Sequence, residues 1–331
     1  MKHSNIALFV SHIGCPNRCT FCNQHIISGE QDTATPEDVR KAVQVALEHG
    51  CHGGQLAFFG GSFTAIDRPY MMELLNAAKP FLDDGSISGL RCSTRPDAID
   101  KEILSLLKEY KIEAIELGAQ SMRDEVLSLN RRGHTADDVR RASKLIQSEG
   151  IELGLQMMTG LYGDDDEGAI YTANEIVALH PTTVRIYPTI TVENTELAKL
   201  YREGKYKPQT LDEAVTLSSK LLRIFDEAKI NVIRCGLHSG GNVEEGFVAG
   251  PYHPAFKELC ESEIYLDKAL ELLKDKPKGS YKIFVSSKEI SKMTGQKRKN
   301  IIKLEDNGYT CKVKALDDLK KYEINIEEDF T

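Results

Sequence analysis

Short β-type runs alternate with amphipathic helical stretches along most of this chain of 331 residues. The runs lie at Ile6–Val10, Gln55–Phe59, Gly89–Ser93, Ala114–Leu117, Leu153–Met158, Thr183–Tyr187 and Asn231–Arg234. Alternating β and α units predict a parallel sheet that is covered by helices. The alternation by itself does not choose between an open sheet and a closed or partial barrel.

Several helix starts are marked by capping sequences. Thr35-Pro36-Glu37-Asp38 offers an N-cap threonine, a proline at the first helical position and acidic residues in the first turn. Thr135–Asp138 and Thr210–Glu213 repeat the threonine and acid pattern, and Gly50 and Gly150 stand where helices are expected to end. These signals predict helices that begin at residues 36, 136 and 211.

The pattern changes after Pro251. A helix-rich stretch, Phe256–Lys274, ends in the linker-like segment Asp275–Gly279. The next elements are predicted as strand Lys282–Val285, helix Lys288–Met293, helix Lys299–Glu305 and strand Thr310–Val313. We therefore expect a β/α part at residues 1–255, a helical connector at 256–279 and a small α+β module at 280–331.

Charge and hydropathy narrow the class of protein. The net charge of −8 argues against a protein that coats nucleic acid non-specifically. No apolar run approaches 18 residues, which a membrane-spanning helix would need. The residues from Met1 lead into a strand-like run too short for the apolar part of a signal peptide. We expect a cytoplasmic protein without a membrane partner.

Three cysteines, Cys15, Cys19 and Cys22, form a C-x3-C-x2-C run. Three thiolates at this spacing can hold three irons of a [4Fe–4S] cluster and leave the fourth iron open. Zinc is the alternative, with His12 or His25 as the fourth ligand. The other cysteines are scattered and are expected to be small buried apolar residues. They are Cys51, Cys92, Cys235, Cys260 and Cys311.

The cysteine run, with Phe21 before its third cysteine, resembles the signature of the radical S-adenosylmethionine (SAM) superfamily. Later strand-end motifs extend the likeness: Phe58–Thr64, Cys92–Asp97, Glu116–Ser121, Asn130–Thr135, Gln156–Leu161, Val184–Thr189, Asn194–Leu197 and Gly204–Pro208. As an ordered set they resemble the radical SAM domain of the Elongator catalytic subunit over residues 5–255. Oxygen-independent coproporphyrinogen oxidase is a more distant likeness, through Gly118-Ala119-Gln120-Ser121 and the later Arg132.

The resemblance implies a partial (β/α)6 radical SAM barrel that binds a [4Fe–4S] cluster at Cys15, Cys19 and Cys22. It also implies SAM as cofactor, cleaved reductively to a 5′-deoxyadenosyl radical. The backbone at Gly60 and Gly61 would hold the amino group of SAM, with Ser62 standing where glutamate is common and Thr64 nearby.

The resemblance assigns further roles at the later strand ends. Gln120 would contact SAM, Arg132 would pair with its carboxylate, and Gln156 would contact its ribose. Tyr187, with Arg185, would line the adenine or the substrate side. Other interpretations remain open at this point: Arg132 in a surface ion pair with Asp137, Gln156 as a buried amide, and His134 as a residue that holds its loop.

The substrate is the least constrained part of the interpretation. We expect a tRNA or other RNA base, with a free small molecule as the alternative: a modified nucleobase cleaved by a carbon–carbon lyase, or a tetrapyrrole. A non-enzymatic iron–sulfur or zinc protein that binds RNA is a third possibility. An electron donor such as flavodoxin or ferredoxin is implied. The Elongator-type acetyltransferase domain has no counterpart in this sequence, so only the radical half of that chemistry is expected.

The small module contains the segment Ile290–Ile302, which resembles the helix–loop–helix of a KH domain. Its basic turn carries Lys292, Lys297, Arg298 and Lys299. Arg298 stands where the second glycine of the KH loop would be. Lys297, Arg298 and Lys299 are therefore candidate contacts for RNA phosphates. A solvated charged turn is the alternative, and the acidic segment Glu323–Asp329 weakens the nucleic-acid interpretation.

Overall fold

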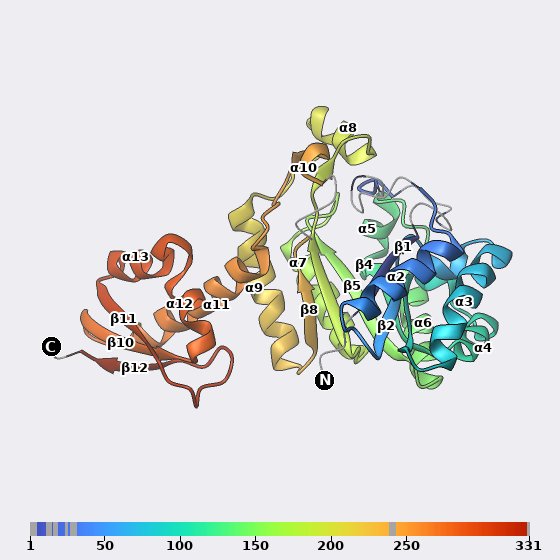
Figure 1. Cartoon of the computed structure of the whole chain (residues 1–331). Helices are drawn as coiled ribbons and strands as arrows, with labels where there is room; N and C mark the ends of the chain where they lie inside the picture. The colour runs from blue at the N-terminus through green and yellow to red at the C-terminus, as the bar shows by residue number, and fades with distance from the viewer. Residues whose placement is uncertain are drawn as a thin grey trace.

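The computed structural model describes residues 5–10, 15, 19–23, 26, 32–237 and 243–329. Within these residues, the main sheet has seven parallel strands in the order β1-β2-β3-β4-β5-β6-β8 (Figure 1). They are β1 (Asn5–Val10), β2 (Gly54–Gly60), β3 (Ile87–Thr94), β4 (Ile112–Gln120), β5 (Glu152–Thr159), β6 (Thr183–Pro188) and β8 (Asn231–Cys235). Each predicted strand is confirmed, with its ends shifted by no more than a few residues.

Helices join the strands and cover one face of the sheet (Figure 1). They are α2 (Pro36–Glu48), α3 (Arg68–Asp83), α4 (Lys101–Glu109), α5 (Asp124–Leu129), α6 (Ala136–Ser148), α7 (Asp166–Ala178), α8 (Glu196–Arg202) and α9 (Leu211–Glu227). The capping signals are confirmed, because Thr35, Thr135 and Thr210 each form a capping box with the acid three residues later. The arrangement is a half-barrel, which confirms the predicted fold class.

The two faces of the sheet differ in composition. On β5, Leu153, Leu155 and Met157 are at most 1% exposed because they pack against the helices. Gln156 and Met158 alternate with them and are half-buried on the opposite face, which we call the inner face. The half-buried inner residues show that this face is less tightly covered than the helix-facing side.

The sheet is strongly curved. The guanidinium carbon of Arg185 on β6 lies 5.2 Å from the ring centre of Phe59 on β2. Three strands separate β2 from β6, which would place them about 19 Å apart in a flat sheet. The inner face therefore encloses the side chains of strands that are distant in the sheet order.

The carboxyl-terminal module follows α11 (Phe256–Leu273) and lies beside the half-barrel (Figure 1). Its elements are β10 (Gly279–Val285), α12 (Ile290–Thr294), α13 (Lys299–Asp306), β11 (Tyr309–Ala315) and β12 (Asn325–Glu328). Helix α11 packs against α9 on the barrel side and against α12 and α13 on the module side. The predicted division at residues 255 and 279 stays a prediction.

Strand β12 was missing from the sequence prediction, which treated its residues as an acidic segment. It pairs antiparallel with β10 in a three-stranded sheet ordered β11-β10-β12. The Asp329 side chain is 1% exposed and forms ion pairs with Lys282 at 3.1 Å and Lys312 at 2.8 Å. Lysines from two neighbouring strands therefore compensate the acidic charge and allow this segment to join the sheet. No helix in the described part of the chain is long and apolar enough to cross a membrane.

Candidate active site at the carboxyl ends of the strands

The described part of the cysteine loop is anchored from two sides. Thr20 donates its backbone N–H to the Asn130 carbonyl at 3.2 Å and its hydroxyl to the Asn130 side-chain oxygen at 2.8 Å. The Thr20 carbonyl in turn accepts the N–H of Leu197. Phe21 packs in an apolar cluster with Val126 and Leu197. The aromatic residue of the cysteine motif thus fixes the loop by packing.

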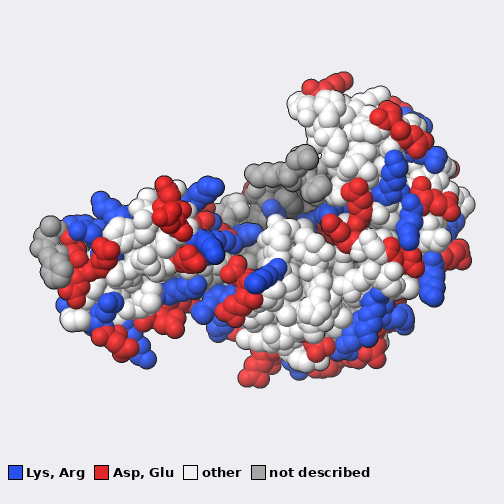
Figure 2. Space-filling view, turned by 90° about the horizontal axis from the view of Figure 1, so that it is seen from below, with Lys and Arg blue, Asp and Glu red and all other residues white. Residues whose placement is uncertain are grey.

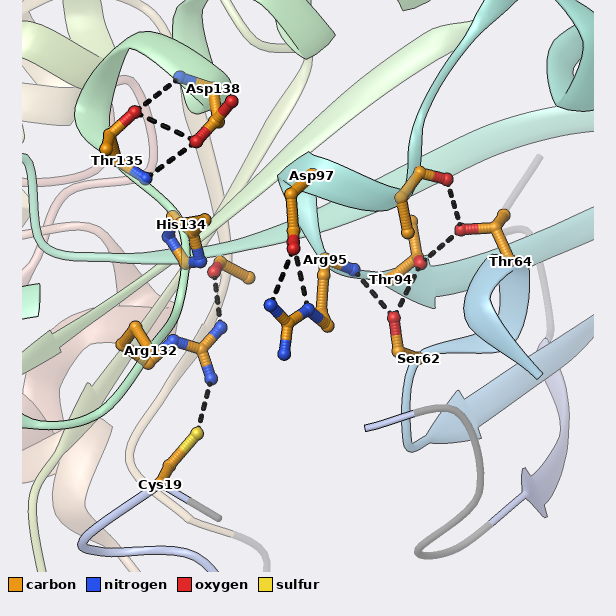
Figure 3. Close-up of polar contacts among 12 residues, drawn as sticks. Cys19, Ser62, Thr64, Thr94, Arg95, Asp97, Arg132, His134, Thr135 and Asp138 are labelled. Carbon is orange, nitrogen blue, oxygen red and sulfur yellow. Dashed lines mark hydrogen bonds and ion pairs between the residues drawn. The ribbon is translucent and has the colours of Figure 1, made fainter. Parts of the chain in front are cut away.

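Arg132 brings the cysteine loop and the end of β4 together (Figure 3). Its Nη1 donates a hydrogen bond to the Cys19 sulfur at 3.2 Å, and its Nη2 donates one to the Gly118 carbonyl at 2.8 Å. Arg132 is only 9% exposed. The alternative of a surface ion pair with Asp137 does not describe this geometry, because Asp137 pairs with Arg140 at 2.6 Å.

A glycine makes this approach possible. A Cβ on Gly118 would lie 3.0 Å from the Gln120 amide nitrogen and 3.3 Å from Arg132 Nη2. A side chain at this position would therefore force the amide and the guanidinium apart. Gly118 thus has a packing role at the site in addition to its place in the sequence motif.

A second arginine lies near the cysteines. Arg95, 6% exposed, makes two parallel hydrogen bonds with the Asp97 carboxylate at 2.9 and 2.6 Å (Figure 3). Loss of hydration, with smaller contributions from Cys19 and Asp97, raises the pKa of the Cys15 thiol above its usual value, although Arg132 and Arg95 act to lower it. The Cys15 thiol therefore holds its proton more tightly than a free cysteine, and iron binding, which needs the thiolate, would have to displace that proton.

The donor set fits an iron–sulfur cluster by its chemistry. Among the described residues, no three His, Cys, Asp or Glu side chains already converge on a common metal position. The three cysteine ligands therefore stay a prediction. The zinc alternative depends on His12 or His25, which lie outside the described residues. Of the other cysteines, Cys92, Cys235, Cys260 and Cys311 are buried as expected, whereas Cys51 is half-buried.

The Gly60–Gly61 turn follows β2 beside the cysteine loop. Gly60 has a φ of +106°, which favours glycine, and Gly61 donates its N–H to the Val10 carbonyl at the end of β1. Ser62 is 1% exposed, and its hydroxyl hydrogen-bonds the Thr94 hydroxyl at 3.0 Å and accepts the Arg95 N–H at 3.1 Å. Thr64 also contacts the Thr94 hydroxyl, at 2.5 Å (Figure 3). Both side chains thus hold the end of β3, which leaves the glycine backbone as the candidate SAM contact.

Gln120 and Gln156 meet on the inner face. Gln156 Nε2 donates to Gln120 Oε1 at 3.3 Å. Gln120 is 5% exposed and has a left-handed φ of +66°, a conformation that costs on the order of 1–3 kcal/mol for a residue other than glycine. This strain turns Gln120 at the strand end beside Arg132, where the resemblance predicts SAM contacts.

His134 is buried near the carboxyl end of β4. Its Nε2 lies 3.2 Å from the Ala119 carbonyl, and the side chain is 5% exposed. Burial and the neighbouring Arg132 lower the pKa of His134 to about 4, so the ring is neutral near pH 7. The geometry favours the interpretation that His134 holds its loop.

An ion-pair network on the inner face was not foreseen from the sequence. Glu116 on β4 is 4% exposed and pairs with Arg91 on β3 at 3.1 Å and with Arg185 on β6 at 2.5 Å. Arg185 also donates to the Tyr187 hydroxyl at 3.4 Å. The available signal was a charged residue inside each of three otherwise apolar strands. Tyr187 thus lies with this network. Arg132 instead hydrogen-bonds Cys19 and the Gly118 carbonyl, and Gln156 hydrogen-bonds Gln120.

The basic turn lies in the module, apart from these strand ends (Figure 1). Lys297 and Arg298 have left-handed φ values of 51° and 64°. Lys299 pairs with Asp212 of α9 at 3.1 Å, and Lys292 pairs with Glu261 and Glu289. Figure 2 shows basic and acidic residues interspersed over one face of the module. Two of the four cations are thus already compensated by acids.

Comparison with known proteins identifies the class. A family model for the radical SAM superfamily matches residues 10–176, and one for the radical SAM C-terminal domain matches residues 181–266. An uncharacterized protein of Methanocaldococcus jannaschii, MJ0486, is 29% identical over 61% of this chain and 65% of its own length. A tRNA uridine(34) acetyltransferase of the same organism is 31% identical over 50% of this chain and 34% of its own length.

The archaeal Elp3 of Methanocaldococcus infernus, with an N-terminal deletion, is a structural neighbour. It matches with a TM-score of 0.62 and 20% identity, over 83% of this chain and 64% of that chain. This likeness supports the fold. The chain spans less than two thirds of the length of each of these relatives. The superfamily model covers about half of the residues, and the chain therefore belongs to the radical SAM superfamily.

Proposed function

We propose that this radical SAM enzyme acts on a base of RNA, most simply tRNA, at the carboxyl ends of its parallel strands. The family implies a [4Fe–4S] cluster and SAM. The observation that carries the proposed site is the convergence of Cys19, Gly118, Gln120 and Arg132 at one strand end. In parallel α/β barrels, the ligand site lies at this end of the strands.

When bound and given one electron, the cofactors would supply a 5′-deoxyadenosyl radical, which abstracts hydrogen from the substrate. An electron donor such as flavodoxin or ferredoxin would deliver that electron. Cys15, Cys19 and Cys22 would hold the cluster. The Gly60–Gly61 backbone would bind the SAM amino group, and Arg132 its carboxylate, because a guanidinium matches a carboxylate in shape and charge.

Gln120 and Gln156 would orient the rest of SAM. Their amide groups already contact each other at 3.3 Å, so each is positioned before a ligand arrives. Tyr187 would line the substrate side, next to Arg185. The half-buried inner face would keep much of the surrounding water from the reacting atoms.

RNA as the substrate is supported by three observations. A relative that is 31% identical over half of this chain is a tRNA uridine(34) acetyltransferase. Lys297 and Arg298 form no ion pair with any acid in the described part of the chain, so their charges are available to phosphate. Their left-handed backbone fits a turn like that of a KH domain.

A free small molecule is the second candidate substrate. The ion pair between Lys299 and Asp212 and the pairing of Lys292 reduce the net positive charge of the turn. Few cations then remain for phosphate contacts, which favours a nucleobase or tetrapyrrole that needs none.

The proposed function can be tested under anaerobic conditions. Protein reconstituted with iron and sulfide is reduced and given SAM, and 5′-deoxyadenosine and methionine are measured by mass spectrometry. We expect cleavage of SAM, and a mass change in nucleosides released from added tRNA. Absence of SAM cleavage by protein that holds its cluster would rule out the proposed chemistry. Unchanged tRNA, together with turnover of a free nucleobase, would replace RNA by the small-molecule substrate.

A further inference from the structure

Two arginines face each other on neighbouring strands of the inner face. Arg185 on β6 is the register partner of Arg234 on β8, so their side chains leave the sheet at the same level. Arg234 is half-buried, as is Arg185. Two cations placed side by side with little solvent repel each other unless an anion lies between or beside them.

Only one of these two arginines is compensated by the described residues. Glu116 pairs with Arg185 through both carboxylate oxygens, and the same carboxylate pairs with Arg91. Glu152 adds a longer contact of 4.0 Å to Arg91. Within the described part of the chain, no acid pairs with Arg234. The guanidinium groups of Arg91, Arg185 and Arg234 thus have two carboxylates between them, which leaves an excess of positive charge here although the chain as a whole is acidic.

Arg234 is held in place by one hydrogen bond, and its other N–H donors have no partner among the described residues. Its Nε donates to the Gly236 carbonyl at 3.1 Å, which fixes the plane of the guanidinium. Its two terminal amino groups make no hydrogen bond to any described residue. Burial lowers the pKa of Arg234, and the neighbouring Arg185 lowers it further, while Tyr187 raises it. The group remains a cation near pH 7 because a guanidinium stays protonated in proteins.

We infer that Arg234, beside Arg185 and Tyr187, binds a phosphate group of the substrate on the inner face. A phosphate carries nearly two negative charges when terminal and one when it links nucleotides, and its oxygens accept the paired donors of a guanidinium. Tyr187 can donate its hydroxyl to the same anion. The inference rests on the proposed function, because a nucleotide substrate carries this phosphate next to the reacting base.

The phosphate site proposed at Arg234 is distinct from the SAM carboxylate site proposed at Arg132. Arg132 lies at the end of β4 beside Cys19, where the SAM carboxylate is expected. Arg234 lies on β8, at the other edge of the sheet from β1. The two arginines can therefore hold anions on different molecules, and their substitution should affect different ligands.

Calorimetry on the full chain tests the inference with inorganic pyrophosphate as the probe, at fixed salt and pH. Arg234→Gln should weaken pyrophosphate binding by about 10- to 100-fold, as expected for the loss of hydrogen bonds to a charged group. Arg234→Lys, which keeps the charge, should retain part of the affinity. Arg40→Gln, which removes an exposed arginine of α2, is the matched control and should change nothing.

Two further titrations separate the sources of the phosphate. If the phosphate belongs to RNA, Arg234→Gln should weaken binding of bulk tRNA about tenfold, with little binding of cytidine 5′-monophosphate by either protein. If it belongs to a free nucleotide, the loss should appear with cytidine 5′-monophosphate and leave tRNA binding unchanged. Either result supports a phosphate site at Arg234.

Three results would overturn the inference: no pyrophosphate binding by the unaltered protein at millimolar concentration, equal binding by Arg234→Gln, or a parallel loss of SAM affinity in that variant. Should Arg234→Gln fail to fold, the same comparison of pyrophosphate and SAM binding is made between the unaltered protein and Arg234→Lys. SAM cleavage without added substrate is measured on the same proteins. Pyrophosphate binding through Arg234 without SAM cleavage would contradict the proposed function alone, and the reverse would contradict this inference alone.

Discussion

Arg132 donates a hydrogen bond to the sulfur of Cys19 at 3.2 Å across 113 positions of sequence. The same guanidinium is tied to the Gly118 carbonyl at 2.8 Å, so the cysteine loop and the end of β4 share one cation. We propose that this guanidinium also pairs with the SAM carboxylate, which it matches in shape and charge. Arg132 would then contact both expected cofactors.

Replacing Arg132 by alanine should weaken SAM binding by about 1.5–3 kcal/mol, the scale of a hydrogen bond to a charged group. Equilibrium binding of SAM to reconstituted protein of known iron content measures this. Arg131→Ala is the matched control, because the Arg131 side chain is 60% exposed and lies 3.8 Å from Glu196. Equal SAM affinity in the two variants would assign Arg132 a purely structural role.

Anaerobic reconstitution should give about four iron and four sulfide per chain, with the cluster held by Cys15, Cys19 and Cys22. Alanine at any one of the three should abolish retention of the cluster. One iron already has no protein ligand, and a cluster held by only two cysteines would be lost. Cys51→Ala should retain it. Metal analysis that finds one zinc per chain and no labile sulfide would contradict the cluster.

If RNA is the substrate, the affinity for tRNA should fall steeply with salt. The slope of log K against log salt should be about −0.7 per phosphate contact on a single strand. Changing Lys297, Arg298 and Lys299 together to alanine should flatten this slope. Lys299→Ala alone should contribute least, because its ammonium already pairs with Asp212. A titration without tRNA binding at low salt would exclude RNA.

Glu116→Gln should destabilise the fold by about 3–5 kcal/mol, because it leaves buried arginines without their shared acid. The side chains of Glu116, Arg91 and Arg185 are 5%, 9% and 14% exposed. Urea unfolding measures the effect, with Glu37→Gln as an exposed control that should change stability by less than about 0.5 kcal/mol. Equal midpoints for the two variants would show that the network contributes no net stability.

Asp164 should make the stability depend on pH. Its side chain is 1% exposed, and burial raises its pKa to about 6 although Arg123 lies 3.6 Å away. The folded state therefore binds this proton more tightly than the unfolded state, whose pKa is about 4. The sign follows: stability is lost as the pH rises from about 4 to about 6, and the cost persists above that range.

Asp164→Asn should remove this dependence and raise the melting temperature at pH 7, as measured by thermal unfolding between pH 4 and pH 7. Asp165→Asn is the matched control, because Asp165 also contacts Arg123, at 3.2 Å, but is 66% exposed. Identical pH profiles for the unaltered protein and Asp164→Asn would show that the carboxylate titrates normally.

Local patterns in the sequence determined the order and type of the main elements. The seven strands of the main sheet follow from apolar runs, and the starts of α2, α6 and α9 follow from threonine caps, since both signals act within a few residues. The cysteine spacing and the strand-end motifs likewise placed the candidate site at one end of the sheet. None of these signals depends on contacts between distant segments.

The tertiary structure decided which distant side chains meet. It turned the acidic segment into β12, because Lys282 and Lys312 compensate Asp329. It also engaged Ser62 with Thr94 and paired Lys299 with Asp212. Such contacts join residues tens of positions apart, and their energy depends on burial and on the partner's charge. A local pattern carries neither quantity, and only the folded chain brings both partners into place.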